Sequence, residues 1–377
     1  MSSLLAQLCS YSQIVVDAGD LHTIATFQPS EIMVTPALIL SSVQQPQHQG
    51  AIDQCLHTAQ QQLGKSASPP QIISTALQHL IAYFANTILQ MSKGRISLCI
   101  DYRFADDPRN LLSYIQKTYS LVSCPERVLI QLPATWTGID TAHHLEQQGI
   151  RTHLSLVFGL HQVIAASKCQ PALISIPVGR IFDWYKRQAD QTDHSPYIVA
   201  DCYNYLHKYG YGTRIMATSF RNLNQVLALA GCDLLCVSPA LFTDLHKSQS
   251  LTRQLSPDCA QASNLPQLTL DQASFHRWHQ TNPLALAKLE ESIHSLSRSL
   301  ANLENIFTKR LQTLQTGKTL SHAIHYIFQT YDLDGDGYVT REEWGGSDAV
   351  FDALDRDKDG RITPTEIAIG LGILLFQ

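Results

Sequence analysis

The feature that most constrains the fold of this 377-residue chain is the alternation of eight short apolar runs with amphipathic segments. Such runs are typical of strands buried on both faces, and helical periodicity between them indicates crossover helices. We expect strands at residues 13–18, 32–35, 96–101, 128–132, 153–158, 172–176, 213–218 and 234–237. Eight such units close on themselves. The pattern therefore predicts an α/β fold, a closed (β/α)8 barrel.

The segments between these runs predict the helices of the barrel. Apolar residues recur at helical spacing in residues 51–63, 70–91, 108–121, 140–148, 197–209 and 222–230. A longer helical pattern from 283 to about 314 would cover the barrel. In this fold the active site is built from polar residues at the C-terminal ends of the strands.

Gln131 interrupts the most apolar of the predicted strands. It stands between Ile130 and Leu132, and Thr135 or Thr137 could cap the helix that follows. Burying an amide without a hydrogen-bond partner costs about 1–3 kcal/mol. We therefore expect Gln131 to find a partner or to face a cavity, and it marks a polar site.

The C-terminal region contains two twelve-residue loops with the EF-hand pattern, 332–343 and 355–366. Each has carboxylates at positions 1, 3 and 5, a glycine at position 6, a backbone carbonyl at position 7 and a glutamate at position 12, which together supply the oxygens that Ca²⁺ prefers. The predicted ligands are Asp332, Asp334, Asp336, Tyr338 and Glu343 in loop one, and Asp355, Asp357, Asp359, Arg361 and Glu366 in loop two. A solvated acidic surface is the alternative, but it needs neither the glycine nor the glutamate.

Charge and spacing divide the chain into two predicted domains. Residues 332–366 contain eleven acids and four bases, a net charge of −7, so the remaining residues carry +2 of the total of −5. We expect a barrel over residues 1–315, a short polar linker at 315–321, and a small all-α calcium-binding domain over 316–377. Only eleven residues separate the two loops, so the helices between them must be short.

Composition also limits where the chain works and what it binds. The nine cysteines are scattered without a Cys-x-x-Cys motif, and the N-terminus lacks the basic and apolar regions of a leader, so we expect a cytoplasmic protein. We expect no membrane span. No basic cluster is interleaved with aromatic residues, which argues against nucleic acid as a partner.

Several motifs of the predicted barrel resemble the transaldolase family. They occur in the family's order at Val15–Asp20, Thr35–Leu40, Thr135–Ile139, Val178–Lys186, Ser219–Asn222 and Leu227–Asp233. The resemblance runs from about residue 4 to about residue 315. It implies a (β/α)8 enzyme of the pentose phosphate pathway that transfers a dihydroxyacetone unit between sugar phosphates through a Schiff base on a strand-four lysine.

Four positions depart from the residues that the resemblance implies. Gln131 stands at the position of the Schiff-base lysine, and Cys99 stands where the family has a proton-relay glutamate. Thr35 and His153 replace two asparagines that bind the dihydroxyacetone unit. A carboxamide nitrogen is delocalised into its carbonyl and cannot form an imine. We therefore expect weak or no transaldolase turnover.

Other positions match the family. Asp17 matches its acid/base aspartate, and Ser155 stands at the position of its strand-five threonine. The resemblance implies substrate binding by Ser155 and Ser175, and phosphate binding by Arg180, Ser219 and Arg221. A guanidinium beside a hydroxyl suits a phosphate ester. We therefore expect retained binding of a sugar phosphate.

Three functions stay open at this point: a sugar-phosphate-binding protein with Ca²⁺ sites, an active transaldolase that uses another amine such as Lys186, and a structural calcium-binding protein with a relic barrel. Asp17, Arg180 and Arg221 have scaffold alternatives as buried or paired charges, and His153 is expected to be a core histidine. A homodimer also stays open.

Overall fold

The computed structural model describes residues 3–101, 103, 108–188 and 192–374 of the chain. The chain divides into two compact units, residues 1–304 and residues 305–377, and each is described by itself. The domain boundary predicted at residue 315 falls within a helix, α15 (Pro283–Tyr331).

The first unit contains an eight-stranded parallel sheet. Its strands follow one another around the sheet in the order β1-β8-β7-β6-β5-β4-β3-β2. They are β1 (Gln13–Val16), β2 (Glu31–Val34), β3 (Arg95–Cys99), β4 (Val128–Pro133), β5 (Thr152–Ser155), β6 (Leu173–Pro177), β7 (Arg214–Thr218) and β8 (Leu234–Val237). All eight predicted strands are present, and the predicted barrel fold is confirmed.

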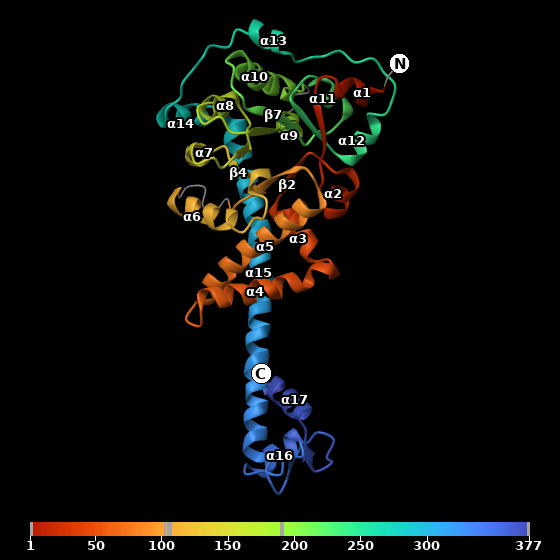
Figure 1. The fold of residues 1–377 in the computed structure, drawn as a ribbon, viewed down its shortest axis with the longest axis vertical. Helices are drawn as coiled ribbons and strands as arrows, with labels where there is room; N and C mark the ends of the chain where they lie inside the picture. The colour runs from red at the N-terminus through yellow and green to blue at the C-terminus, as the bar shows by residue number, and fades with distance from the viewer. Residues whose placement is uncertain (1–2, 102, 104–107, 189–191, 375–377) are drawn as a thin grey trace. The chain divides into compact units, whose positions relative to one another are not determined.

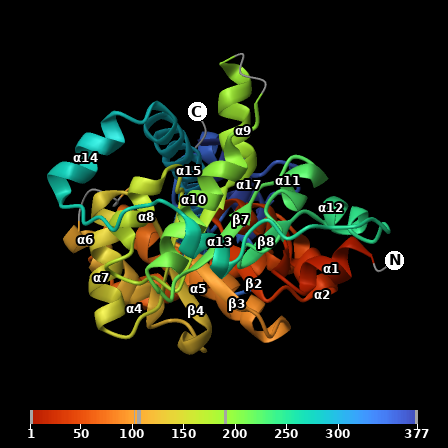
Figure 2. The ribbon, with the colours of Figure 1, turned by 90° about the horizontal axis from the view of Figure 1, so that it is seen from above.

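Helices surround these strands, as the two ribbon views show (Figure 1, Figure 2). They are α1 (Leu4–Cys9), α2 (Leu21–Phe27), α3 (Pro36–Val43), α4 (Gln49–Leu63), α5 (Pro69–Met91), α6 (Pro108–Tyr119), α7 (Trp136–Gln147), α8 (Leu160–Ala166), α9 (Val178–Arg187), α10 (Ser195–Lys208), α11 (Leu223–Leu227), α12 (Pro239–Asp244), α13 (Pro257–Ala262), α14 (Gln272–Gln280) and the first part of α15. Side-chain caps begin several of them. Thr135, one of two candidate caps, accepts a hydrogen bond from the Gly138 amide at 3.0 Å and starts α7.

The barrel is nearly closed. Hydrogen-bonded ladders join β2 through β8 in sequence order, and β8 pairs with β1, whereas the described backbone shows no ladder between β1 and β2. The Gln13 side-chain amide spans this seam and donates to the Ser30 hydroxyl, just before β2, at 2.5 Å. Side chains therefore supply a contact at the seam.

The barrel interior is packed with apolar side chains. One cluster contains Val15, Met33, Leu129, Leu173, Met216 and Leu234, which come from β1, β2, β4, β6, β7 and β8. Side chains from six strands can meet in this way only inside the barrel. The cluster therefore fixes which face of each of these strands points inward.

Helix α5 is the one described helix whose length and composition would allow a membrane span. It has no Asp, Glu, Lys or Arg across Pro69–Met91, so the sequence contains a candidate stretch where we expected none. Most of its apolar window, 61%, is buried within the fold. Its apolar character is therefore accounted for by packing, since it contacts α2, α4, α6 and β3.

Helix α15 is longer than the sequence predicted. It continues through residues 315–321, where we expected a linker, and ends at Tyr331. This segment contains one glycine and no proline, so it has no strong helix breaker, and a polar composition alone does not end a helix. The prediction that the helix ends near residue 314 is therefore wrong, and the segment predicted as a linker is helical.

The second unit contains the two loops, and one described helix lies between them where the sequence predicted short helices for both hands. Its elements after α15 are β9 (Val339–Thr340), α16 (Asp348–Leu354), β10 (Arg361–Ile362) and α17 (Pro364–Leu374). The antiparallel β9–β10 pair places Val339 opposite Ile362. Both side chains are fully buried in a core with Phe351, Leu354 and Ile367. The two-residue ladder expected between the loops is therefore present.

Candidate functional site

A layer of polar side chains lies above the apolar cluster, at the C-terminal end of the barrel. Successive side chains on a strand alternate between its faces, so residues two apart share a face. Asp17, Gln131 and Ser175 each follow a member of the cluster by two residues. All three therefore face the barrel axis, as the sequence predicted for this site.

Gln131 is buried in the centre of this layer on β4. Its side chain is 6% exposed, and its Oε1 atom has no hydrogen-bond partner among the described residues. In the sheet register it pairs with Cys99 on β3 and with His153 on β5. Three of the four positions that depart from the family's pattern are thus neighbours in the fold.

His153 is a buried, neutral histidine. Its Nδ1 atom lies 2.9 Å from the Ser97 hydroxyl on β3, across the barrel interior, and Nε2 has no partner among the described residues. Burial first, and the charge of Arg95 second, lower the pKa of His153 to about 3. The imidazole is therefore uncharged near neutral pH, in agreement with the expectation of a core histidine.

Asp17 and Ser155 differ in exposure. Burial raises the pKa of the Asp17 carboxyl, which remains partly exposed at the end of β1. Ser155 is buried, and its hydroxyl donates to the Leu132 carbonyl at 3.3 Å. A carboxyl with a raised pKa at an accessible strand end can exchange protons with a ligand.

The two predicted phosphate-binding arginines have different partners. Arg180 lies in the first turn of α9, and its guanidinium donates to the Ser292 hydroxyl on α15 at 2.5 Å. Arg221 follows β7 and forms an ion pair with Asp183 at 2.7 Å. Arg180 thus contacts a neutral group, while the charge of Arg221 is balanced by a carboxylate.

Gly179 lies where the start of α9 approaches the segment that follows β7. A Cβ atom at this position would lie 2.2 Å from the Ser219 carbonyl and 2.9 Å from carbons of Arg221. Ser219 itself has φ of +60°, a strained conformation for a residue with a side chain. The absence of a side chain at 179, next to Arg180, therefore lets the start of α9 lie against Ser219 and Arg221.

The sequence did not predict that residues of α15 lie near Arg180, or that Asp183 pairs with Arg221. Lys288, Glu291 and Ser292 of α15 lie near Arg180, and Asp183 pairs with Arg221. The spacing of Lys288, Glu291 and Ser292 at i, i+3 and i+4, which places them on one side of α15, was the one available signal in the sequence.

A further ion-pair group lies near β3. Arg103 joins Asp101 to Glu304, with its Nε 2.9 Å from the Asp101 carboxylate.

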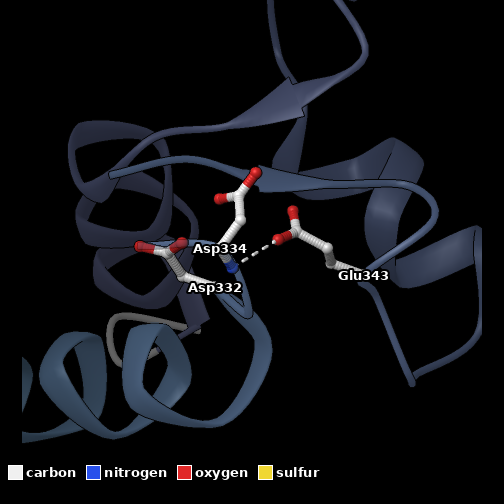
Figure 3. A group of neighbouring side chains, drawn as sticks. All are labelled: Asp332, Asp334 and Glu343. Atoms are coloured by element: carbon white, nitrogen blue, oxygen red, sulfur yellow. Dashed lines mark hydrogen bonds between the residues drawn. The ribbon is translucent and has the colours of Figure 1, made fainter. Parts of the chain in front are cut away.

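A second candidate site lies in the C-terminal loops. In loop one, carboxylate oxygens of Asp332, Asp334 and Glu343 lie within 4.8 Å of one another. Figure 3 shows Glu343 reaching across the loop, where it accepts a hydrogen bond from the Asp334 amide at 3.4 Å. In loop two, carboxylate oxygens of Asp355, Asp357 and Asp359 lie within the same distance of one another. Three of the five predicted ligands therefore converge in each loop, while Asp336 and Glu366 lie outside these two groups.

The two loops have equivalent internal hydrogen bonds at matching positions. Glu343 accepts from the Thr340 amide at 2.8 Å, and Glu366 accepts from the Thr363 amide at the same distance. Asp336 and Asp359 accept from the amides of the residues at position 7, at 2.9 and 2.8 Å. These amides hold the carboxylates in place, and the donor set consists of oxygens alone, which fits Ca²⁺.

Sequence comparisons identify a family for each of the two regions. The pattern of the transaldolase/fructose-6-phosphate aldolase family matches residues 14–307, and the EF-hand pattern matches residues 324–345 and 348–368. The chain is 39% identical to a protein named transaldolase from Thermosynechococcus vestitus, over 99% of this chain and 98% of the relative. A protein named transaldolase from Prochlorococcus marinus is 39% identical over 100% of this chain and 99% of the relative. One from Methylococcus capsulatus is 37% identical over 83% of this chain and 98% of the relative.

Family membership follows from the barrel and the comparisons together. The matched region begins in β1, includes every strand of the barrel and ends in α15. The chain therefore belongs to the transaldolase/fructose-6-phosphate aldolase family and carries an EF-hand pair after its barrel.

Proposed function

We propose that this protein binds a sugar phosphate at its barrel mouth, catalyses dihydroxyacetone transfer weakly or not at all, and binds Ca²⁺ in its C-terminal loops. The observation that carries the weak or absent turnover is the carboxamide of Gln131, buried on β4 where the family resemblance implies the Schiff-base lysine. The closely related proteins named transaldolase support the substrate class and a role in the pentose phosphate pathway.

The chemistry of the barrel mouth favours binding over turnover. An imine needs an amine lone pair, and the Gln131 nitrogen shares its lone pair with the carbonyl. The neighbouring Cys99 is a thiol in place of a carboxylate proton relay, and His153 is neutral and faces Ser97. Lys186, a candidate substitute amine, is exposed on α9 with its ammonium 5.8 Å from the Phe182 ring centroid. It is a surface lysine.

The phosphate-binding side of the site supports retained recognition. The close approach at Gly179 places the start of α9, which carries Arg180, against Ser219 and Arg221. Ser175 and Ser155 add buried hydroxyls on neighbouring strands. Arginine can donate several charge-assisted hydrogen bonds to a phosphate ester in one plane.

The C-terminal loops support Ca²⁺ binding. Bound Ca²⁺ would take its oxygens from the aspartates at positions 1, 3 and 5, the carbonyls of Tyr338 and Arg361, and the two glutamates, Glu343 and Glu366. Glycines at position 6, Gly337 and Gly360, have φ of +85° and +84°, which allows the sharp turn that the pattern requires. The nine free cysteines are consistent with our further proposal of a cytoplasmic location.

Calorimetry with fructose 6-phosphate tests the binding proposal. We expect the wild type to bind it in the presence of a chelator, and Arg180→Met to bind it at least about tenfold more weakly. Arg109→Met, which removes an exposed arginine on α6, is the matched control and should leave the affinity unchanged. If the wild type binds no fructose 6-phosphate at millimolar concentration, the proposed ligand class is wrong and a structural calcium-binding role is favoured.

A further inference from the structure

Lys288 is a buried lysine on the face of α15 that packs onto the first unit. Its side chain is 4% exposed, and it lies on the same buried face as Ala285, Leu289 and Ser292. Buried lysines are rare because the ammonium must keep an anionic or polar partner. The partner here is Glu291, with Nζ 2.6 Å from Oε2.

The partner of Lys288 is itself open to solvent. The Glu291 side chain is 59% exposed, so the ion pair joins a fixed buried cation to a carboxylate that can rotate away. Exposed carboxylates contribute little to stability through such pairs. The position of the ammonium is therefore set by the fold, while that of the carboxylate is set mainly by the ammonium.

A chain of hydrogen bonds connects Lys288 to the phosphate-binding side of the barrel mouth. The Arg180 guanidinium donates to the Ser292 hydroxyl at 2.5 Å, and this hydroxyl donates to the Lys288 carbonyl at 2.6 Å. Arg180 lies in the first turn of α9, which begins directly after β6. Lys288 thus lies one helical turn from the residue that contacts Arg180.

Three cations act on the Glu291 carboxylate. A hydrogen bond from Lys288 lowers the pKa of Glu291 against the effect of burial, and the charges of Lys288, Arg187 and Arg180 lower it further. A phosphate monoester carries about −1.5 to −2 near neutral pH, so it is a stronger anionic partner for these cations than one carboxylate. Arg221, in contrast, is balanced by Asp183.

We propose that Lys288 binds the phosphate group of the ligand together with Arg180, and that Glu291 is an internal anion which the phosphate displaces from Lys288. This inference rests on the proposed sugar-phosphate binding and adds a residue from α15 to that site. The buried ammonium keeps an anionic partner in both states, and the displaced carboxylate turns into water. Glu291 therefore competes with the ligand.

Phosphate binding by single-charge variants tests the proposal on the full chain. We would titrate inorganic phosphate and fructose 6-phosphate into the wild type, Lys288→Met, Glu291→Gln and Glu290→Gln by calorimetry in the presence of a chelator. Glu290 is the matched control, an exposed carboxylate one residue away on the same helix. We expect Glu291→Gln to bind phosphate about tenfold more tightly and Lys288→Met about tenfold more weakly, with Glu290→Gln within about twofold of the wild type.

The outcomes separate this inference from the function on which it rests. If all four proteins bind phosphate and fructose 6-phosphate with equal affinity, the roles of Lys288 and Glu291 are wrong while sugar-phosphate binding stands. If none of the four binds either probe, the proposed ligand class fails as well. If Lys288→Met does not fold, the exposed Glu291→Gln variant decides alone: tighter binding supports the proposal, and unchanged binding overturns it.

Discussion

Gln131 on β4 and His153 on β5 are register partners, and each buries one polar atom without a hydrogen-bond partner among the described residues, Oε1 of Gln131 and Nε2 of His153. An unpaired buried polar atom costs about 1–3 kcal/mol. The two strands carry this cost at the positions where the family resemblance implies a lysine and an asparagine. The carboxamide and the imidazole therefore form a polar site without an amine at this point of the barrel.

The protonation of His153 makes stability depend on pH. Its pKa is about 3 in the folded protein, against an ordinary value of 6.5, so the unfolded state binds the additional proton between these values. Stability is therefore lost as pH falls below 6.5, at up to about 1.4 kcal/mol per pH unit. We expect urea unfolding to show that the wild type loses about 2–3 kcal/mol more than His153→Asn between pH 6 and 4. Parallel pH profiles would contradict the assignment.

Substitution of Gly179 should damage both the fold and the phosphate site. In Gly179→Ala the new methyl would lie 2.2 Å from the Ser219 carbonyl, so the loop that carries Arg221 must move. We expect a loss of about 1–3 kcal/mol in the free energy of unfolding, and weaker binding of fructose 6-phosphate.

Gly212→Ala provides the control for that substitution. A Cβ atom there would meet nothing within 4 Å, so stability and binding should stay close to those of the wild type. Equal stability and equal ligand affinity of the two alanine variants would show that the close approach at Gly179 has no energetic role.

The glutamate at position 12 should determine Ca²⁺ binding in each hand. Glu343→Gln removes one carboxylate oxygen of the bidentate pair, and we expect calorimetry to show one strong Ca²⁺ site in place of two. Glu342→Gln is the matched control, because Glu342 is exposed and lies at position 11, outside the ligand set. An unchanged titration of Glu343→Gln would exclude this glutamate as a ligand.

Local patterns predicted what local interactions determine. The run Leu234–Val237 was predicted as β8 with the observed bounds, because a strand buried on both faces is apolar along its whole length. The two EF-hand loops were predicted from the sequence, because the whole pattern of each lies within twelve positions. The conformations of Gly337 and Gly360 follow the same rule.

Contacts between distant segments could not be predicted in this way. Asp183 lies 38 residues before Arg221, and Arg180 contacts Ser292 across 112 residues, so no periodicity in the sequence indicates either pair. The length of α15 was missed for a different reason: residues 315–321 are polar, but they contain too few helix breakers to form a linker. Lys288 lies in the part of α15 that was predicted, and its burial was missed because it depends on contacts with distant segments.

The most direct test is a coupled assay of dihydroxyacetone transfer from fructose 6-phosphate to erythrose 4-phosphate. It would compare the wild type with Gln131→Lys, each in Ca²⁺ and in chelator. The account predicts little or no turnover by the wild type under both conditions, and at most a trace in Gln131→Lys, because Cys99 still replaces the proton-relay glutamate. Rapid turnover by the wild type, with a borohydride-trappable adduct, would contradict the account and assign the Schiff base to another lysine.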